Sequence, residues 1–131
     1  MHHPFADLIG LVVTQQRAGY SECSLALEAK HMNPHGVVHG AVVYALADTG
    51  MGAAAYPTLA PGELCATLEI KITYFKPARS GELRCITTLV NRSKTLANFD
   101  AMVYCGEVLL AKANGNYAIF TPSAGTVKLS S

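Results

Sequence analysis

The chain has 131 residues, of which 50% are hydrophobic and 15% charged, and its formal net charge is +1. This length fits one domain, and the composition excludes an intrinsically disordered protein. Ten basic residues against nine acidic ones form no basic surface of the kind that binds nucleic acid. Because the mean hydropathy of +0.25 is high for so small a domain, we expect the chain to associate with copies of itself.

Turn residues divide the chain into short segments, without repeats or low-complexity linkers. Hydrophobic periodicity predicts a short helical turn and one long helix, over residues 4–10 and 38–55. Alternating and apolar runs predict strands at residues 11–17, 22–29, 65–75, 82–91, 98–105 and 108–120. We therefore expect one domain over residues 1–122, followed by a polar, frayed tail over residues 123–131.

The segment 37–56 contains the longest apolar stretch, and its length alone would allow it to span a membrane. Asp48 lies near its middle, where a charge is costly in lipid, and no flanking basic or tryptophan residues anchor its ends. These features favour a buried helix and no membrane association. The N-terminus lacks the features of a signal peptide, and the four cysteines form neither a zinc motif nor a redox pair, so we expect reduced thiols and a cytoplasmic location.

Alanine and glycine make up much of this helix, and each interior glycine costs about 1 kcal/mol relative to alanine. Some other element must therefore pack close to the helix backbone. One helix that is apolar all round, accompanied by five or six long strands, predicts an α+β domain in which an antiparallel sheet wraps around a central helix, the hotdog fold. An ordinary α+β sandwich is the alternative. A wrapped sheet covers one side of the helix, so a second subunit is expected on the other.

The densest polar cluster spans residues 31–41, and Asp48 follows it in the helix. Three interpretations are open. Histidines at every fourth position suggest a metal site, but Pro34 and Gly36 break the helix that such a site would need. A loop beside a structural buried aspartate is the second interpretation. The third is an acyl-transfer site, in which the N–H groups at the start of the helix, beside Gly40, stabilise a developing oxyanion.

Helix geometry decides how Gly40 and Asp48 can cooperate. Eight residues separate the two by about 12 Å along the axis and about 80° around it, so within one helix they cannot serve the same carbonyl carbon. His39 and Asp48 point to roughly opposite faces of the helix. If two such helices pair across a twofold axis, however, Gly40 of one subunit can approach Asp48 of the other. Asp48 would then deprotonate a water or attack the acyl group directly to form an anhydride, and the sequence leaves both possibilities open.

Two stretches of the chain resemble the hotdog acyl-CoA thioesterases of the phenylacetate-degradation (PaaI) type. The stretch HMNPHGVVHGAVVYALADTG is similar to that family's H-x-N-x-x-G-x-x-H-G-G motif followed by a helix with L-x-D, with Ala41 in place of the usual second glycine. The stretch TLEIKITYFKPARSGE is similar to its second motif. The resemblance implies hydrolysis of an acyl-CoA thioester without a metal or other cofactor, in a homodimer that pairs again into a homotetramer.

Roles for individual residues follow from the positions that match. Gly40 matches the glycine whose N–H polarises the thioester carbonyl, and Asp48 matches the catalytic carboxylate supplied by the facing subunit. Asn33 and His39 match residues that hold the thioester and the leaving sulfur. Thr67 falls where some members have a hydroxyl that assists the attacking water, although a threonine in an alternating strand also has an ordinary structural role.

Coenzyme A carries phosphates, which cationic loop residues can bind. The candidates follow two strands, at Lys76 and Arg79 and at Arg92, Ser93 and Lys94. Surface solvation is the competing explanation for each of them. Two other functions remain for such a chain: a non-catalytic acyl-CoA binding or sensing protein, and a hotdog dehydratase, which the spacing from Gly40 to Asp48 disfavours.

Overall fold

The structure is a computed structural model that describes residues 2–123, so the predicted tail lies outside the described residues except for Ser123. Two α-helices and two short 3-10 helices are present: α1 Pro4–Ile9, α2 Gly40–Ala55, η1 Ala29–His31 and η2 Tyr56–Thr58. The strands are β1 Leu11–Arg17, β2 Tyr20–Ala26, β3 Leu64–Tyr74, β4 Glu82–Arg92, β5 Leu96–Cys105 and β6 Val108–Phe120.

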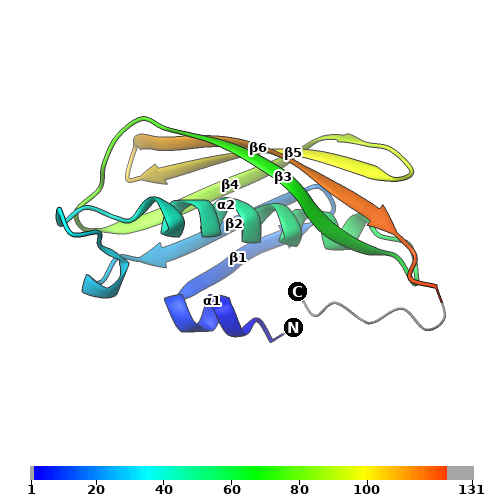
Figure 1. The fold of residues 1–131 in the computed structure, drawn as a ribbon, viewed down its shortest axis with the longest axis horizontal. Helices are drawn as coiled ribbons and strands as arrows, with labels where there is room; N and C mark the ends of the chain where they lie inside the picture. Colours follow the sequence, from blue (N-terminus) through cyan, green and yellow to red (C-terminus); the bar gives the residue numbers. More distant parts are fainter. Residues whose placement is uncertain (1, 124–131) are drawn as a thin grey trace.

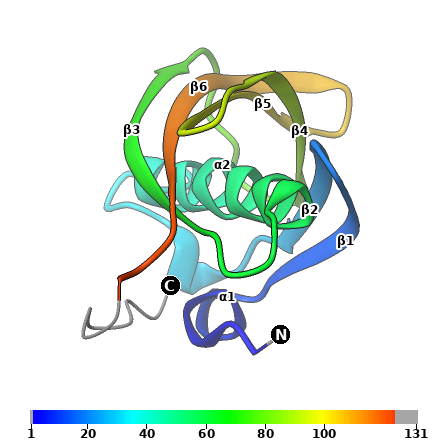
Figure 2. The same ribbon diagram turned by 90° about the vertical axis from the view of Figure 1, so that its right-hand side faces the viewer.

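The six strands form one sheet in the order β1-β2-β4-β5-β6-β3, and every neighbouring pair is antiparallel. The sheet lies across α2 in Figure 1, and Figure 2, turned by 90°, shows the sheet curving around the helix from β3 to β1. The short helix α1 lies beyond the open side of this curve. The prediction of an α+β hotdog fold with one long central helix is confirmed.

Three predicted elements had boundaries that were wrong by two or three residues: the second strand at both ends, the long helix at its start, and the fifth strand, which begins at Leu96 and not at residue 98. The second strand begins at Tyr20, directly after a turn in which Gly19 has a φ of 77°, and ends at Ala26 rather than at residue 29. Beyond it, the Leu27 N–H bonds the Gly81 carbonyl and η1 begins. The long helix begins at Gly40 and not at residue 38, because His39 is extended and accepts the Ala41 N–H on its side chain, which makes it the N-cap.

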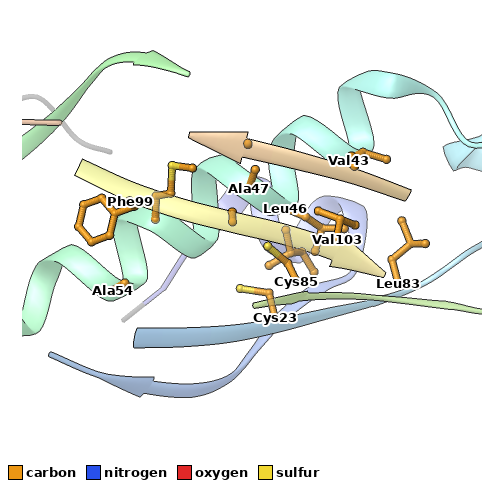
Figure 3. Packing of buried hydrophobic residues seen from close by; sticks show 14 of the residues in the cluster. Cys23, Val43, Leu46, Ala47, Ala54, Leu83, Cys85, Phe99 and Val103 are labelled. Atoms are coloured by element: carbon orange, nitrogen blue, oxygen red, sulfur yellow. The ribbon is translucent and has the colours of Figure 1, made fainter. Parts of the chain in front are cut away.

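The hydrophobic core lies between the concave face of the sheet and α2. Leu46, Ala47 and Met51 of the helix are fully buried against strand residues such as Leu83 and Phe99. Figure 3 shows this packing from close by, and the small side chains of Ala47 and Ala54 of α2 lie in the same cluster as the larger side chains of the strands. The sheet can therefore approach the helix closely, which is what its alanines and glycines predicted.

The helix approaches the sheet closely at Gly50. A Cβ atom added there would lie 2.6 Å from the Oγ1 atom of Thr87, while the Ser21 hydroxyl donates a hydrogen bond to the Gly50 carbonyl at 2.6 Å. Both hydroxyl side chains are fully buried. In contrast, an added Cβ at Gly52 would have no atom within 4 Å. The two glycines therefore face different environments, one the sheet and the other open space.

This contrast predicts opposite effects of alanine at the two positions. Gly50→Ala should reduce the free energy of unfolding by about 1–2 kcal/mol, because an overpacking cost of up to about 3 kcal/mol exceeds a helix-propensity gain of about 1 kcal/mol. Gly52→Ala should have the same helix-propensity gain without an overpacking cost, so it should be neutral or stabilising. Urea unfolding of both variants measures the effects. A Gly50→Ala protein at least as stable as the wild type would contradict the close approach.

Two of the four unbridged cysteines, Cys23 and Cys85, are buried and face each other as register partners of β2 and β4. Burial raises the pKa of the Cys23 thiol to about 11 and that of Cys85 to about 12. Both pKa values exceed that of an unfolded thiol, about 8.5. The stability linked to these thiols is therefore complete below about pH 8.5 and is lost as the pH rises toward 11.

We expect the free energy of unfolding to fall between pH 8 and pH 10.5, and to fall less in a Cys23→Ala, Cys85→Ala variant. The variant removes the two thiols that ionise more readily in the unfolded chain, while tyrosines and lysines contribute equally to both proteins. Urea titrations at both pH values provide the comparison. Parallel pH dependence in wild type and variant would show that these thiols are not responsible.

None of the helices in the described part of the chain is long and apolar enough to cross a membrane.

Candidate active site

Two hydroxyl groups converge on the carboxylate of Asp48, which lies near the middle of α2. The Thr67 hydroxyl donates a hydrogen bond to Oδ1 of Asp48 at 2.9 Å. The Tyr117 hydroxyl lies 2.5 Å from the same oxygen and 2.8 Å from the backbone carbonyl oxygen of Asp48. Thr67 and Tyr117 are register partners on β3 and β6, so the pairing of these strands places both hydroxyls next to the helix.

A cavity of about 810 Å³ adjoins this carboxylate. Asp48, Thr49, Gly52 and Ala53 of α2 line one side of it. Further residues come from α1, β1, β3 and β6, among them Phe5, Leu11, Val13, Thr14, Gln16, Cys65, Thr67 and Tyr117. The cavity therefore combines two carboxylates, those of Asp7 and Asp48, with several hydroxyl and amide groups and apolar walls, as pockets for small organic ligands commonly do.

Cys65 also lines this cavity, at the start of β3. Cys65 is 17 residues from Asp48 in the sequence, and the fold brings the two residues to the same cavity. Burial, and secondarily the negative charge of Asp48, raises the pKa of the Cys65 thiol above its ordinary value. The thiol therefore stays protonated near neutral pH, which makes Cys65 a poor nucleophile despite its position.

Gly40 is the first residue of α2 and lines a second cavity of about 330 Å³, which Asp48 does not reach. Its carbonyl oxygen accepts a hydrogen bond from the Tyr74 hydroxyl at 2.8 Å, and an added Cβ would lie 3.2 Å from the Tyr74 ring. Within residues 2–123, the Gly40 N–H donates no hydrogen bond. One subunit thus places a free helix N-terminal N–H in one cavity and the carboxylate in another.

The two other predicted polar site residues, Asn33 and His39, flank this N-terminus. His39 accepts the Ala41 N–H on Nδ1 at 2.9 Å, so in the neutral ring Nε2 carries the proton. Asn33 accepts the N–H groups of His35 and Val37 on Oδ1, at 2.9 and 3.3 Å, which orders the loop. Each side chain therefore uses one polar atom to hold the backbone and keeps a donor for another partner.

His31 has a structural role. Its Nδ1 accepts the Glu28 N–H at 2.9 Å, its Nε2 lies 2.7 Å from the Ile9 carbonyl oxygen, and its side chain is buried. Its backbone carbonyl also accepts the His39 N–H. Both ring nitrogens are thus engaged, which leaves none for a metal. No group of three or more His, Cys, Asp or Glu side chains in residues 2–123 is arranged to hold a metal ion.

The cationic candidates are divided between two ends of the subunit. Lys76 lines the smaller cavity together with Gly40, and the exposed Arg79 follows it in the loop between β3 and β4. That loop and the turn between β4 and β5 lie at opposite ends of the molecule in Figure 1. The turn contains the remaining three candidates, Arg92, Ser93 and Lys94.

Of the two cationic side chains in this turn, which lies within the described residues, only that of Lys94 forms no ion pair or hydrogen bond. Arg92 forms an ion pair with Glu63 at 3.2 Å and bonds the Ser93 carbonyl. The Ser93 hydroxyl is bonded to the backbone of Leu96. A phosphate would therefore have to compete with Glu63 for the Arg92 guanidinium.

The structure brings Asp48 and Thr67 together, and it separates them from Gly40, Asn33 and His39. One contact of this site, the one made by Tyr117, was not predicted from the sequence. Its only local signal is the alternation in the last strand, which places Tyr117 on the inward face with other buried residues. That alternation indicates burial but says nothing about which helix residue the hydroxyl meets.

Comparison with known proteins identifies the family of this chain. The family model described as "Thioesterase superfamily" matches residues 35–112. A Pseudomonas aeruginosa protein named as an esterase is 30% identical over 86% of this chain and 85% of its own length. The proofreading thioesterase EntH of Klebsiella pneumoniae is 25% identical over 73% of this chain and 70% of its own length.

Among solved structures, a mutant of the phenylacetic acid degradation protein PaaI from Thermus thermophilus superposes with a TM-score of 0.83 and 26% identity. The superposition covers 88% of this chain and 98% of that one. The matched segment 35–112 includes the start of α2, Asp48 and Thr67. This chain therefore belongs to the thioesterase superfamily, as a hotdog-fold thioesterase of the PaaI type that hydrolyses thioesters.

Proposed function

We propose that this protein hydrolyses acyl-CoA thioesters to free acid and CoA in sites that two subunits share. Asp48 of one subunit acts as general base or nucleophile, and the Gly40 N–H of the other stabilises the oxyanion. The observation that carries the proposal is the distribution of these groups in one subunit. A carboxylate with two hydroxyl partners lies in one cavity, and a free helix N-terminal N–H lies in another.

The edge of the sheet suggests how the two halves meet. β3 is the last strand in the sheet order, so one of its edges has no partner strand within the described residues, and Leu68 on it is 59% exposed. Such an edge is able to pair with another chain. Antiparallel pairing of two copies of β3 about a twofold axis at Lys71 would set Ile70 opposite Ile72, which lie on the same face of the strand. Because β3 has a bulge between Thr67 and Glu69, this register would bring Thr67 of one subunit next to Tyr74 of the other.

That register would complete the site. Thr67 contacts Asp48, and the Tyr74 hydroxyl contacts the backbone of Gly40. A twofold axis at the centre of β3 would thus bring Asp48 of each subunit toward Gly40 of its partner, twice in each dimer. Self-association, expected from the high hydropathy, then becomes a requirement for activity. We extend the proposal to a homotetramer made of two such dimers.

In the proposed reaction, the thioester carbonyl oxygen accepts the Gly40 N–H at the positive end of the helix dipole. The amide of Asn33 and the Nε2–H of His39 are the donors available nearby for the thioester and the leaving sulfur. Asp48 either takes a proton from water as the water attacks the carbonyl carbon, or attacks that carbon itself to form an anhydride that water then cleaves. In both routes the bond between the carbonyl carbon and sulfur breaks, and CoA leaves as a thiolate that takes up the proton released from water. Thr67 helps to hold the carboxylate or the water. No resident cofactor takes part in this scheme.

For the phosphates of CoA, the proposal gives the main role to Lys76 and Arg79. Lys76 shares a cavity with Gly40, and Arg79 is exposed in the same loop. Lys94 is the available cation of the other group, whereas Arg92 and Ser93 are engaged in the turn that presents it. Charge-assisted contacts of this kind bind phosphate without requiring a deep pocket.

Thiol release from a panel of short, medium and aromatic acyl-CoAs by the purified protein tests the proposal. We expect turnover with at least one member and recovery of free CoA in equal amount to the acid. Tight binding of acyl-CoA without turnover would overturn the proposal and favour a binding or sensing protein. Turnover of thioesters that lack the nucleotide, with no preference for CoA, would remove the role assigned to Lys76 and Arg79.

A further inference from the structure

Tyr117 occupies an unusually constrained position at the end of the sheet that faces Asp48. Its side chain is 3% exposed on β6, where it lies opposite Thr67 of β3 and Ala97 of β5. Its ring packs edge-to-face against the fully buried ring of Phe99, with centroids 5.6 Å apart and an interplanar angle of 83°. A tyrosine packed in this way has little freedom to rotate, so its hydroxyl is held at one place.

That place is beside both the carboxylate and the backbone of one residue. The Tyr117 hydroxyl lies within hydrogen-bond distance of Oδ1 and of the carbonyl oxygen of Asp48. The Thr67 hydroxyl also donates to Oδ1. In residues 2–123, no group donates a hydrogen bond to Oδ2. The two carboxylate oxygens thus differ sharply, because one meets two fixed hydroxyls and the other meets none.

We propose that Tyr117 is a positioning residue of the thioesterase reaction: it holds Oδ1 of Asp48 in place and thereby leaves Oδ2 as the oxygen that takes the proton or attacks. The inference rests on the function proposed above. It adds a residue from the last strand to a site otherwise made by α2, its preceding loop and β3. Because Tyr117 contacts the carboxylate and not the reacting carbon, its effect passes through Asp48.

The chemistry of the hydroxyl suits this role. Burial, followed by the negative charge of Asp48, raises the pKa of Tyr117 far above its ordinary value. The hydroxyl of Tyr117 therefore stays protonated at neutral pH and remains a hydrogen-bond donor. Donation to the ionised carboxylate compensates in part for the loss of solvent around Asp48. A phenylalanine in this position would keep the ring packing on Phe99 and remove only the donor.

The test compares Tyr117→Phe with a matched control, Tyr20→Phe. Tyr20 also donates a hydrogen bond to a carboxylate, that of Glu22 at 2.6 Å, but on β2 and outside both cavities. We expect kcat to fall about 10- to 100-fold in Tyr117→Phe, the scale of a misplaced catalytic group, with KM changed less than about twofold. Tyr20→Phe should match the wild type. Thermal unfolding monitors whether both variants fold.

A second comparison separates positioning from a general structural effect. In the Asp48→Asn background, Tyr117→Phe should cause no further loss of kcat, because the group through which it acts has already been removed. An equal loss in both backgrounds would overturn the inference. Isotope-edited infrared spectra provide a readout apart from turnover: the Asp48 carboxylate band, identified by its absence in Asp48→Asn, should shift in Tyr117→Phe and stay unchanged in Tyr20→Phe.

The outcomes also distinguish this inference from the function on which it rests. Wild-type turnover with an undiminished kcat in Tyr117→Phe overturns the positioning role and leaves the thioesterase proposal intact. A wild type that releases no CoA from any acyl-CoA overturns both, even if the carboxylate band shifts. The inference is supported if Tyr117→Phe lowers kcat when Asp48 is present but not in the Asp48→Asn variant, and if the Asp48 carboxylate band shifts.

Discussion

Asp48→Asn is expected to lower kcat by about 10²-fold or more, the scale of a positioned general base. The substitution keeps the shape of the side chain, and the amide oxygen can still accept the hydroxyls of Thr67 and Tyr117. It removes the charge, so the group can neither take a proton from water nor attack the thioester. KM should change little, because the acyl-CoA contacts proposed for the loop residues are untouched.

The matched control for this variant is Asp100→Asn. Asp100 is a carboxylate on β5 that accepts a hydrogen bond from Asn114 at 2.9 Å and lines neither cavity. We expect its activity to equal that of the wild type in the same steady-state assay of thiol release. Equal cleavage by wild type and Asp48→Asn would refute the assignment of the base, whichever acyl group the enzyme prefers.

Mixed dimers are expected to recover activity that neither parent possesses. If each site combines Asn33 of one subunit with Asp48 of the other, a dimer of Asp48→Asn with Asn33→Ala contains one intact site and one that carries both changes. Random exchange at equal concentrations makes half of the dimers mixed, so activity should return to about one quarter of the wild-type level. The increase should follow the time course of subunit exchange.

The same experiment has a clear opposite outcome. Were Asn33 and Asp48 to act within one subunit, every site in the mixture would carry one change and activity would stay at the level of the parents. Subunit exchange must be verified independently, for example by mass spectrometry of differently tagged chains. Verified exchange without recovered activity would exclude the shared site and leave the separation of Gly40 and Asp48 in one subunit unexplained.

Much of the fold was predictable from the sequence, because periodicity and turn residues act locally. The alternating runs predicted six strands, and residues 11–17 and 108–120 match β1 and β6 as observed. The start of α2 was placed two residues early, because the extended backbone of His39 depends on its own capping contact. The spacing between Gly40 and Asp48 predicted their separation within one helix, which a rigid helix preserves in any fold.

The contacts around Asp48 were less predictable. Tyr117 lies 69 residues away in the chain, and it reaches Asp48 because β6 lies between β5 and β3 in the sheet, with Tyr117 opposite Thr67 of β3. The proximity of Cys65 has the same origin. Arg92 appears in the sequence as one of several surface cations, but the folded chain pairs it with Glu63. Each of these relations depends on sheet order, which local patterns do not specify.

By itself, the sequence determined the order of helices and strands, the apolar helix that the sheet encloses, and the axial distance between the two groups of the proposed site. These properties depend on residues close together in the chain. Only the tertiary structure decided which oxygen of Asp48 is held, by which hydroxyls, and in which cavity. Those choices come from strand pairings between distant segments, where the closure of a curved sheet around α2 brings Thr67 and Tyr117 to the same carboxylate.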